Sequence, residues 1–396
     1  VIEAMTMLDL GISPYSGDIF HETPMIIYVF HFLVDCSELV FMFVDVLTTV
    51  ILYLATKQLM NYLHERQKRE HRLYKVDTSA LLLDPRDTSY LPLRVAMAYL
   101  LNPYTILTCV ARSTCAINNL LIALSLLATL HGSILMMAVF LALATYQSLY
   151  PVMLIIPATL HMAQVVKLYV FICVTVLEIY SISFGFSLQL PGYIKDCNTQ
   201  VQCLRRRLPK SFGLKTAIKG LSLTVKAMPY IFLLQCYHWQ SRFESWSRFR
   251  LSTLSEPLFC WGSPLCKVML YSHPFFHMCL QVGLIAVFKS YPSVGDLALF
   301  LALLPMWTHL KCYLRNTLLV TCLLVVCSVL FPVLWLWIFS GSANANFYYA
   351  TTLAFNTGQI LLISDYLYAF LRREFHLFHG LRVKSDDGKD SYVLLK

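Results

Sequence analysis

The longest stretch without a charged residue places the strongest constraint on how this chain can fold. Residues 113–166 form a run of 54 positions that contains no lysine, arginine, aspartate or glutamate. One helix needs only about 20 apolar residues to cross a bilayer, so this run predicts more than one crossing. A second uncharged run, the 24 residues at 317–340, has the length of one tilted span. With 58% hydrophobic and 13% charged residues, the composition is that of a membrane protein.

The pattern within these runs favours helices over strands. Backbone groups inside a bilayer have to be hydrogen-bonded within the protein, which leaves helical bundles and closed barrels. The apolar runs are continuous, whereas barrel strands alternate. We therefore predict an all-α, polytopic transmembrane helical bundle that forms a single membrane domain over 1–396. The expected spans are 24–56, 91–111, 113–130, 132–149, 150–165, 168–190, 275–289, 294–310, 317–340 and 347–371. The shorter ones are also consistent with half-helices or re-entrant hairpins.

Basic residues between the spans predict which ends face the cytosol. The first connector is rich in them: Lys57, Arg66, Lys68, Arg69, Arg72 and Lys75 stand against Glu65 and Glu70. This predicts a cytosolic loop at 57–90 and a luminal loop at 1–23. The arginine pair behind the last span likewise predicts a cytosolic tail at 372–396.

Acidic side chains within apolar runs are costly unless they face a cavity or a partner, so they are candidate functional residues. Four of them lie in the first and last runs: Asp35, Glu38, Asp45 and Asp365. For the amides Asn118, Asn119 and Gln359 we favour a hydrogen bond between helices, and for Asp365 both roles stay open.

The segment ISDYLYAFLRREFHLFHG, at 363–380, sets an acid, an arginine pair and two histidines behind the last apolar run. Arg372 and Arg373 are typical of a topological stop, and contact with a lipid headgroup is the alternative. Asp365 shares a helix face with Arg372 but lies roughly 10 Å away along the axis, too far for an ion pair. A headgroup or a partner protein would fill this gap, and catalysis is the least favoured role.

The spacing of cysteines and histidines lacks the common metal and redox motifs. Thirteen cysteines occur, many of them in apolar spans, without any C-x-x-C or H-E-x-x-H pattern. His376 and His379 have no further ligand close by in the sequence, so we predict no metal site, no cofactor and no disulfide framework.

The segment at 191–262 differs from the rest of the chain in charge. Residues 192–250 include eleven basic and two acidic ones, so their net charge of +9 equals that of the whole chain. A cytosolic loop on anionic lipid would explain the three arginines at 205–207. A nucleic-acid patch is disfavoured beside so many spans.

Six separated stretches occur in the order found in one family. They are LDLGISPYSGDIFHETPMIIYVFHFL (8–33), YLLNPYTILTCVARSTCAINN (99–119), FLALATYQSLYP (140–151), FKSYPSVGD (288–296), LFPVLWLWIFSGSANANF (330–347) and GQILLISDYLYAFLRRE (358–374). Together they resemble the PIG-U subunit family of the GPI transamidase. Against that family, the chain lacks a first span before the luminal loop, so we expect an N-terminally incomplete sequence. The basic segment replaces apolar spans until similarity resumes near Pro264, which favours an artefact of the gene model at 191–262.

The resemblance implies a GT-C-like membrane fold, as in glycosyltransferases of the endoplasmic reticulum, with catalysis exchanged for substrate handling. It implies a multi-pass, non-catalytic subunit that binds the GPI lipid and presents it for attachment to the C-terminus of precursor proteins. The implied partners are a catalytic cysteine-protease-like subunit, a metallopeptidase-like subunit, PIG-T and PIG-S, with no nucleic acid. The alternative is a GT-C mannosyltransferase that uses a dolichol-phosphate sugar. It needs an acidic base in the luminal loop, which holds Asp9, Asp18 and Glu22 but no D-x-D.

The resemblance also singles out candidate site residues. GSANANF, at 341–347, lies between the last two spans on the predicted luminal side, and the amides of Asn344 and Asn346 suit sugar hydroxyls or phosphate oxygens of GPI. An ordinary polar turn is the alternative.

The ISDYLYAFLRRE region resembles part of a fatty acid elongase pattern, which implies contact with acyl chains, with Tyr366, Tyr368 and Phe370 facing lipid. Lipid or partner contacts are implied for four residues: Asp365, Tyr366, Arg372 and Arg373.

Overall fold

The computed structural model describes residues 2–11, 22–34, 36–84, 88–166, 272–289, 292–341 and 344–380. Every regular element in these ranges is helical, which confirms an all-α fold for this part of the chain. The helices are α1 (Ile2–Asp9), α2 (Pro24–Leu33), α3 (Ser37–Glu70), η1 (His71–Leu73), η2 (Val76–Leu81), α5 (Leu91–Leu100), α6 (Pro103–Val110), α7 (Cys115–Leu130), α8 (Ile134–Gln147), η3 (Tyr150–Leu154), α9 (Ile155–Val166), α15 (Pro274–Phe288), α16 (Val294–Leu303), η4 (Leu304–Tyr313), α17 (Thr317–Phe339) and α18 (Ala345–His379).

The chain divides into two compact units, one made of Val1–Ala158 with Phe275–Lys396 and the other of Thr159–Pro274. The expected span at 168–190 and the basic segment at 191–262 lie outside the described residues. All contacts considered below belong to the first unit.

Two helices in the described part of the chain are long and apolar enough to cross a membrane, Ser37–Leu73 and Thr317–Phe339. A third crossing results if α5 and α6, which meet at a bend of 43°, form one broken span. The break has a local cause, because Pro103 begins α6 and the Asn102 side chain accepts a hydrogen bond from the Tyr104 amide at 3.1 Å. Helices α7, α8 and α15 are shorter apolar helices, in keeping with the short spans expected there.

The first expected span is divided in the structure. Helix α2 ends at Leu33, and α3 begins at Ser37 and continues through the expected start of a loop at 57 as far as Glu70. Salt bridges one turn apart support this polar extension, with 2.9 Å between Arg66 and Glu70 and 3.0 Å between Lys68 and Glu65. The 57–90 region is therefore helical at its start and then continues through two short 3₁₀ helices.

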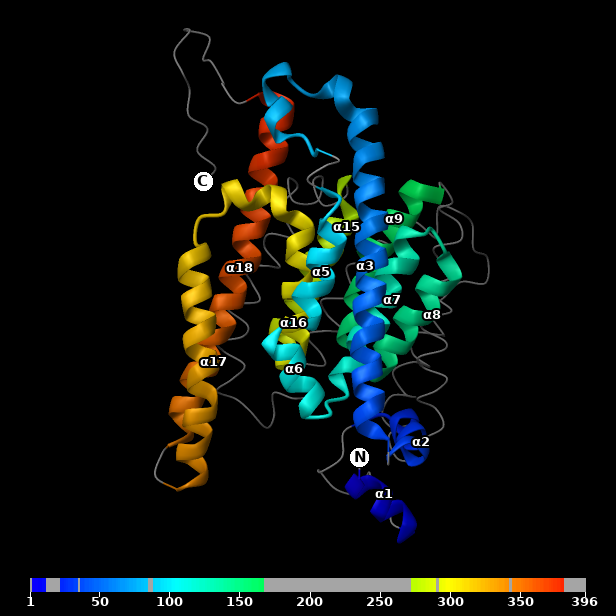
Figure 1. Ribbon diagram of the computed structural model, residues 1–396, viewed down its shortest axis with the longest axis vertical. Helices are drawn as coiled ribbons and strands as arrows, with labels where there is room; N and C mark the ends of the chain where they lie inside the picture. Colours follow the sequence, from blue (N-terminus) through cyan, green and yellow to red (C-terminus); the bar gives the residue numbers. More distant parts are fainter. Residues whose placement is uncertain are drawn as a thin grey trace, which may run out of the picture. The chain divides into compact units, whose positions relative to one another are not determined.

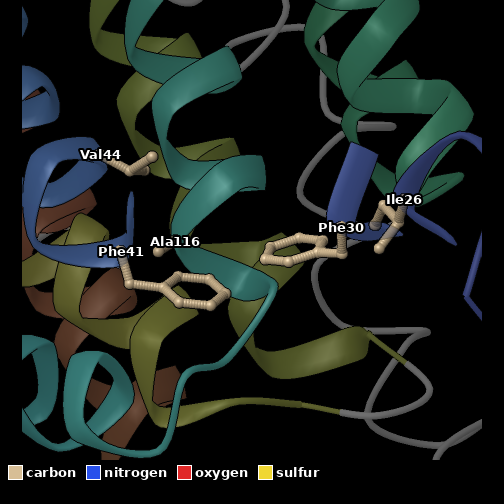
Figure 2. Packing of buried hydrophobic residues seen from close by; sticks show 5 residues of the cluster. All are labelled: Ile26, Phe30, Phe41, Val44 and Ala116. Atoms are coloured by element: carbon tan, nitrogen blue, oxygen red, sulfur yellow. The ribbon is translucent and has the colours of Figure 1, made fainter. Parts of the chain in front are cut away.

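Within the first unit the helices pack side by side around α3 and α7. Helix α3 lies against α5 and α7, α7 lies against α8, and α16 contacts α5, α6 and α7 (Figure 1). An apolar cluster joins α2 and α3 to the first turn of α7 through Ile26, Phe30, Phe41, Val44 and Ala116 (Figure 2). The rings of Phe30 and Phe41 stack with their centroids 5.5 Å apart.

Helices α17 and α18 form an antiparallel pair along one side of the unit (Figure 1). Gly358 of α18 lies against Leu323 and Leu324 of α17, where an added Cβ would come within 3.2 Å of a leucine methyl group. The absence of a side chain at Gly358 thus lets the two helices approach closely. The pair carries both groups of residues that the sequence singled out, one group at each end.

Candidate functional site

The turn between α17 and α18 holds the two asparagines singled out as GPI contacts. Gly341 ends α17 with a φ of 74°, a left-handed conformation that glycine adopts without strain. Asn344 is the N-cap of α18, because its side-chain oxygen accepts a hydrogen bond from the Asn346 amide at 3.1 Å. Both asparagines are exposed, so the side chain of Asn346 and the amino group of Asn344 are accessible to a ligand.

Large aromatic side chains surround this turn. Trp335, Trp337 and Phe339 in the last turns of α17 are exposed, as is Phe347 in the first turn of α18. Tryptophan and other aromatic residues concentrate where a membrane meets water. Exposed aromatic side chains therefore flank the turn on both helices.

At the opposite end of the pair, Asp365 of α18 binds the start of α17. Its carboxylate accepts hydrogen bonds of 3.1 Å from the backbone amides of Arg315 and Asn316, and the residue is only 6% exposed. A carboxylate at a helix N-terminus compensates the unpaired amides and the positive end of the helix dipole. The partner that the sequence left open for Asp365 is therefore found within the chain.

Arg373 is engaged within the chain as well. It is 7% exposed, and its guanidinium donates to the Glu374 carboxylate at 3.1 Å and to the Leu81 carbonyl oxygen at 3.0 Å. Burial lowers the pKa of Arg373, and the neighbouring Glu374 opposes this shift. A further hydrogen bond, from the Lys75 amide to the Leu377 carbonyl oxygen, joins the same two segments. Arg373 thus fastens the segment after α3 to α18.

The aromatic residues of this region divide between interior and surface. Tyr366 and Phe370 are buried, and the Phe370 ring stacks on Phe276 of α15 and meets the edge of Trp307 in η4. This arrangement differs from the lipid-facing one expected from the sequence. The reason is the helix period, because positions four apart share a face and this face packs against η4. Tyr368, two residues from each, is partly exposed.

Arg372 points outward together with a second arginine that sequence reasoning missed. The Arg315 guanidinium lies 3.5 Å from the centroid of the Tyr368 ring, and Arg372 donates to the hydroxyl of the same tyrosine at 3.4 Å. The Arg372 guanidinium also lies 5.6 Å from the centroid of the Tyr313 ring. Arg315 was overlooked because it precedes α17 in the chain, fifty residues from the motif that it joins.

An ion pair between the partly buried Lys289 and the buried Asp296 is the second feature that sequence reasoning missed. Lys289 donates to both oxygens of Asp296 at 3.1 Å, and Asp296 also completes a capping box with Ser293 at the start of α16. Cys115 and Asn119 of α7 contact the same turn, at 3.3 Å from the Asp296 carboxylate and 2.9 Å from the Gly295 carbonyl oxygen. In the sequence, the S-x-x-D spacing of Ser293 and Asp296 could have predicted this capping box.

The acids of the segment before α2 and of the first apolar run have separate surroundings. The Glu22 carboxylate accepts from the Thr114 hydroxyl at 2.7 Å, and Glu38 pairs with Arg112. Asp45 is buried and accepts from the Tyr99 hydroxyl at 3.2 Å. Asp18 and Asp35 lie outside the described residues.

The hydrogen bond between helices that was expected for Asn118 and Asn119 is found for one of them. Asn119 bridges helices, as predicted, whereas neither side-chain atom of the buried Asn118 has a hydrogen-bond partner among the described residues. In the described ranges no group of three His, Cys, Asp or Glu residues is arranged to hold a metal ion.

Comparison with known proteins identifies one family. Residues 1–355 match the family model for the GPI transamidase subunit PIG-U. The chain is 47% identical over 399 residues to the GPI-anchor transamidase component PIGU of Homo sapiens, an alignment that covers 100% of this chain and 90% of the relative. The same component of Mus musculus gives equal values. The GPI transamidase component GAB1 of Saccharomyces cerevisiae is 27% identical over 281 residues, covering 70% of this chain and 67% of the relative. The matched range includes Asn344 and Asn346 and ends before Asp365.

Proposed function

The chain belongs to the PIG-U family of GPI transamidase subunits, and from this membership we propose that it is a non-catalytic component of the GPI transamidase in the endoplasmic reticulum membrane. Its role is to bind the GPI lipid and present it for attachment to the C-terminus of precursor proteins. The observation that carries this proposal is the 47% identity, over the whole chain, to relatives named as GPI-anchor transamidase components.

Presentation lowers the barrier to attachment by positioning rather than by chemistry. The terminal amine of GPI has to reach an activated carbonyl group on the precursor, and holding both in one complex converts a bimolecular encounter into an intramolecular step. A cysteine of the catalytic cysteine-protease-like subunit would first attack the precursor, forming a thioester and releasing the C-terminal peptide. The GPI amine then attacks this thioester, so that the amide bond forms and the thiol leaves. A metallopeptidase-like subunit, PIG-T and PIG-S are the other proposed partners, and the proposed scaffold is GT-C-like.

We assign the headgroup contact to Asn344 and Asn346. Both asparagines are exposed, and the aromatic residues around them support a place at the membrane interface. Amide side chains both donate and accept hydrogen bonds, as hydroxyl and phosphate groups of a glycolipid require. The start of α18 adds the positive end of the helix dipole, which favours a phosphate.

The other four candidate residues receive different roles in this proposal. Asp365, Tyr366 and Arg373 are buried, which supports a role in holding α17 and α18 in place, so that they act on the turn indirectly. Arg372 is exposed at the surface and is the member of the group that contacts lipid. The GPI contacts and this second lipid contact therefore lie at opposite ends of the helix pair.

A lipid profile of cells that lack the gene tests the function. We expect complete, ethanolamine-bearing GPI to accumulate together with uncleaved precursor proteins, because the block would fall at the transamidase step. Accumulation of GPI intermediates that lack a mannose would instead identify the chain as a GT-C mannosyltransferase and would overturn the proposal.

Substitutions in the turn test the site separately. In cells that lack the endogenous gene, Asn346→Ala is expected to lower surface display of a GPI-anchored reporter about tenfold, the effect of losing hydrogen bonds worth roughly 1.4 kcal/mol. Asn344→Ser keeps the helix cap while removing the amide, so it separates ligand contact from helix stability.

Asn316→Ala is the matched control, because Asn316 is an exposed asparagine at the other end of α17 whose side chain makes no capping bond. Full reporter display with Asn346→Ala and Asn344→Ser, at normal protein levels, would contradict the assignment of these two residues. The function proposed for the whole chain would still rest on the lipid profile.

A further inference from the structure

We propose that Arg315 and Arg372 form a second lipid site, which binds the phosphate of an anionic phospholipid at the end of the helix pair remote from the GPI turn. This site goes beyond GPI presentation. The topology expected from the basic loops places it on the cytosolic side, whereas the glycan of GPI would meet the opposite end.

The geometry joins two guanidinium groups from different parts of the chain. Arg315 precedes α17 and stacks on the face of Tyr368 at 3.5 Å, while Arg372, one turn beyond Tyr368 on α18, donates to its hydroxyl at 3.4 Å. Both arginines are exposed. One tyrosine therefore holds both side chains in place, which reduces the rotamer freedom that a bound phosphate would otherwise have to remove.

A second aromatic pair forms the other border of this basic site. The rings of Tyr313 and His376 are stacked with centroids 5.8 Å apart, and Arg372 lies over the Tyr313 ring at 5.6 Å. The neighbouring Lys311 is exposed and adds a third positive charge beside Tyr313 in the sequence. The basic side chains of the site thus pack against aromatic rings.

The positive charge of this site is not neutralised by the carboxylates that the structure describes. Among the described residues, neither Arg315 nor Arg372 takes part in a salt bridge. Asp365 lies close by, but its oxygens accept from backbone amides. Glu374 is buried against Arg373. An external anion would complement the two exposed guanidinium groups.

The adjoining surface favours a lipid over a soluble phosphate. Leu318 and Leu319, in the first turn of α17 directly after Arg315, are 81% and 59% exposed. Arginine binds phosphate with two parallel hydrogen bonds, and an apolar surface beside it accommodates acyl chains. A phospholipid offers both a phosphate and acyl chains, because its phosphate lies at the membrane surface directly above its chains.

Equilibrium binding of a fluorescent dioctanoyl phosphatidic acid to the purified full-length chain in neutral detergent tests the proposal. Dioctanoyl phosphatidylcholine and inorganic phosphate serve as competitors. Arg315→Gln with Arg372→Gln is expected to weaken binding about 25-fold, since each basic residue near a membrane surface contributes about fivefold. The backbone amide of Arg315 remains available to Asp365 in this variant.

Arg69→Gln with Arg72→Gln is the charge-matched control, because both residues are exposed and belong to the connector that contacts the end of α18. We expect this control to bind within about twofold of the parent. An equal loss of affinity in the control would mean that general surface charge causes the binding, and it would overturn the proposed site. If inorganic phosphate displaces the labelled phosphatidic acid as effectively as unlabelled dioctanoyl phosphatidic acid does, the lipid assignment is overturned.

The Arg315→Lys, Arg372→Lys variant keeps the charge and guards against misfolding of the glutamine variant. It is expected to bind more weakly than the parent, because lysine lacks the planar fork of donors. Unchanged affinity in the lysine variant would overturn a site built on paired guanidinium groups.

Discussion

The two ends of the α17–α18 pair show how differently polar residues are used within one helical hairpin. At the turn, Asn344 caps α18 and the remaining amide groups are exposed. At the other end, Asp365 and Arg373 are buried, and their charged groups bind backbone and carboxylate partners. A group with partners inside the chain holds the fold together, whereas a group left accessible is available to a ligand. The comparison therefore separates positioning residues from contact residues.

The largest effect on stability is expected for Arg373→Ala. The substitution would remove the arginine that pairs with the Glu374 carboxylate, which is 3% exposed, and would free the Leu81 carbonyl oxygen. Removing one member of a buried pair costs about 3–5 kcal/mol. Unfolding of the purified chain in an SDS titration, followed by tryptophan fluorescence, measures the change. The neighbouring Arg372→Ala should stay within about 0.5 kcal/mol of the parent, and equal effects from both would erase the contrast between buried and exposed arginines.

Asp365→Ala is expected to cost about 2–3 kcal/mol in the same titration, because the amides of Arg315 and Asn316 would lose a charged acceptor. Asp365→Asn keeps one acceptor oxygen and should lose about half as much. The graded series distinguishes a capping role from a lipid contact. Parental stability in both variants, with reduced lipid binding, would favour direct contact instead.

Asn344→Ala is expected to cost about 1 kcal/mol, the usual contribution of an N-cap. Asn344→Ser should restore most of this loss, since serine also caps helices. Comparing the two variants shows how much of the stability loss comes from the missing N-cap of α18. A serine variant as unstable as the alanine variant would argue that the amide has another partner.

The smallest effect is expected for Asn346→Ala, whose stability should match the parent within about 0.5 kcal/mol because only its backbone amide is bonded in the turn. Reporter display should nevertheless fall, as proposed above. A large loss of stability here would place Asn346 among the positioning residues and weaken the contrast between the two ends.

Local composition predicted the helices more closely than it predicted their partners. The uncharged run at 317–340 agrees with α17 at Thr317–Phe339, since a continuous apolar segment can only be satisfied by helical hydrogen bonds in lipid. The helix expected to end with the span at 371 continues in α18 to His379. The helix extends further because its last turns pack against the segment after α3, a contact that no local pattern reveals.

The sequence by itself determined that the chain is a helical membrane protein, where most of its apolar helices lie, and which family it resembles. Those features depend on hydrophobicity and motifs that are read within short windows. Only the tertiary structure decided which polar residues are satisfied inside the protein. Asp365 finds its donors fifty positions away, and Arg373 finds an acceptor at Leu81, because antiparallel packing brings distant helix ends together. Burial requires that such groups be paired, but their partners follow from the packing alone.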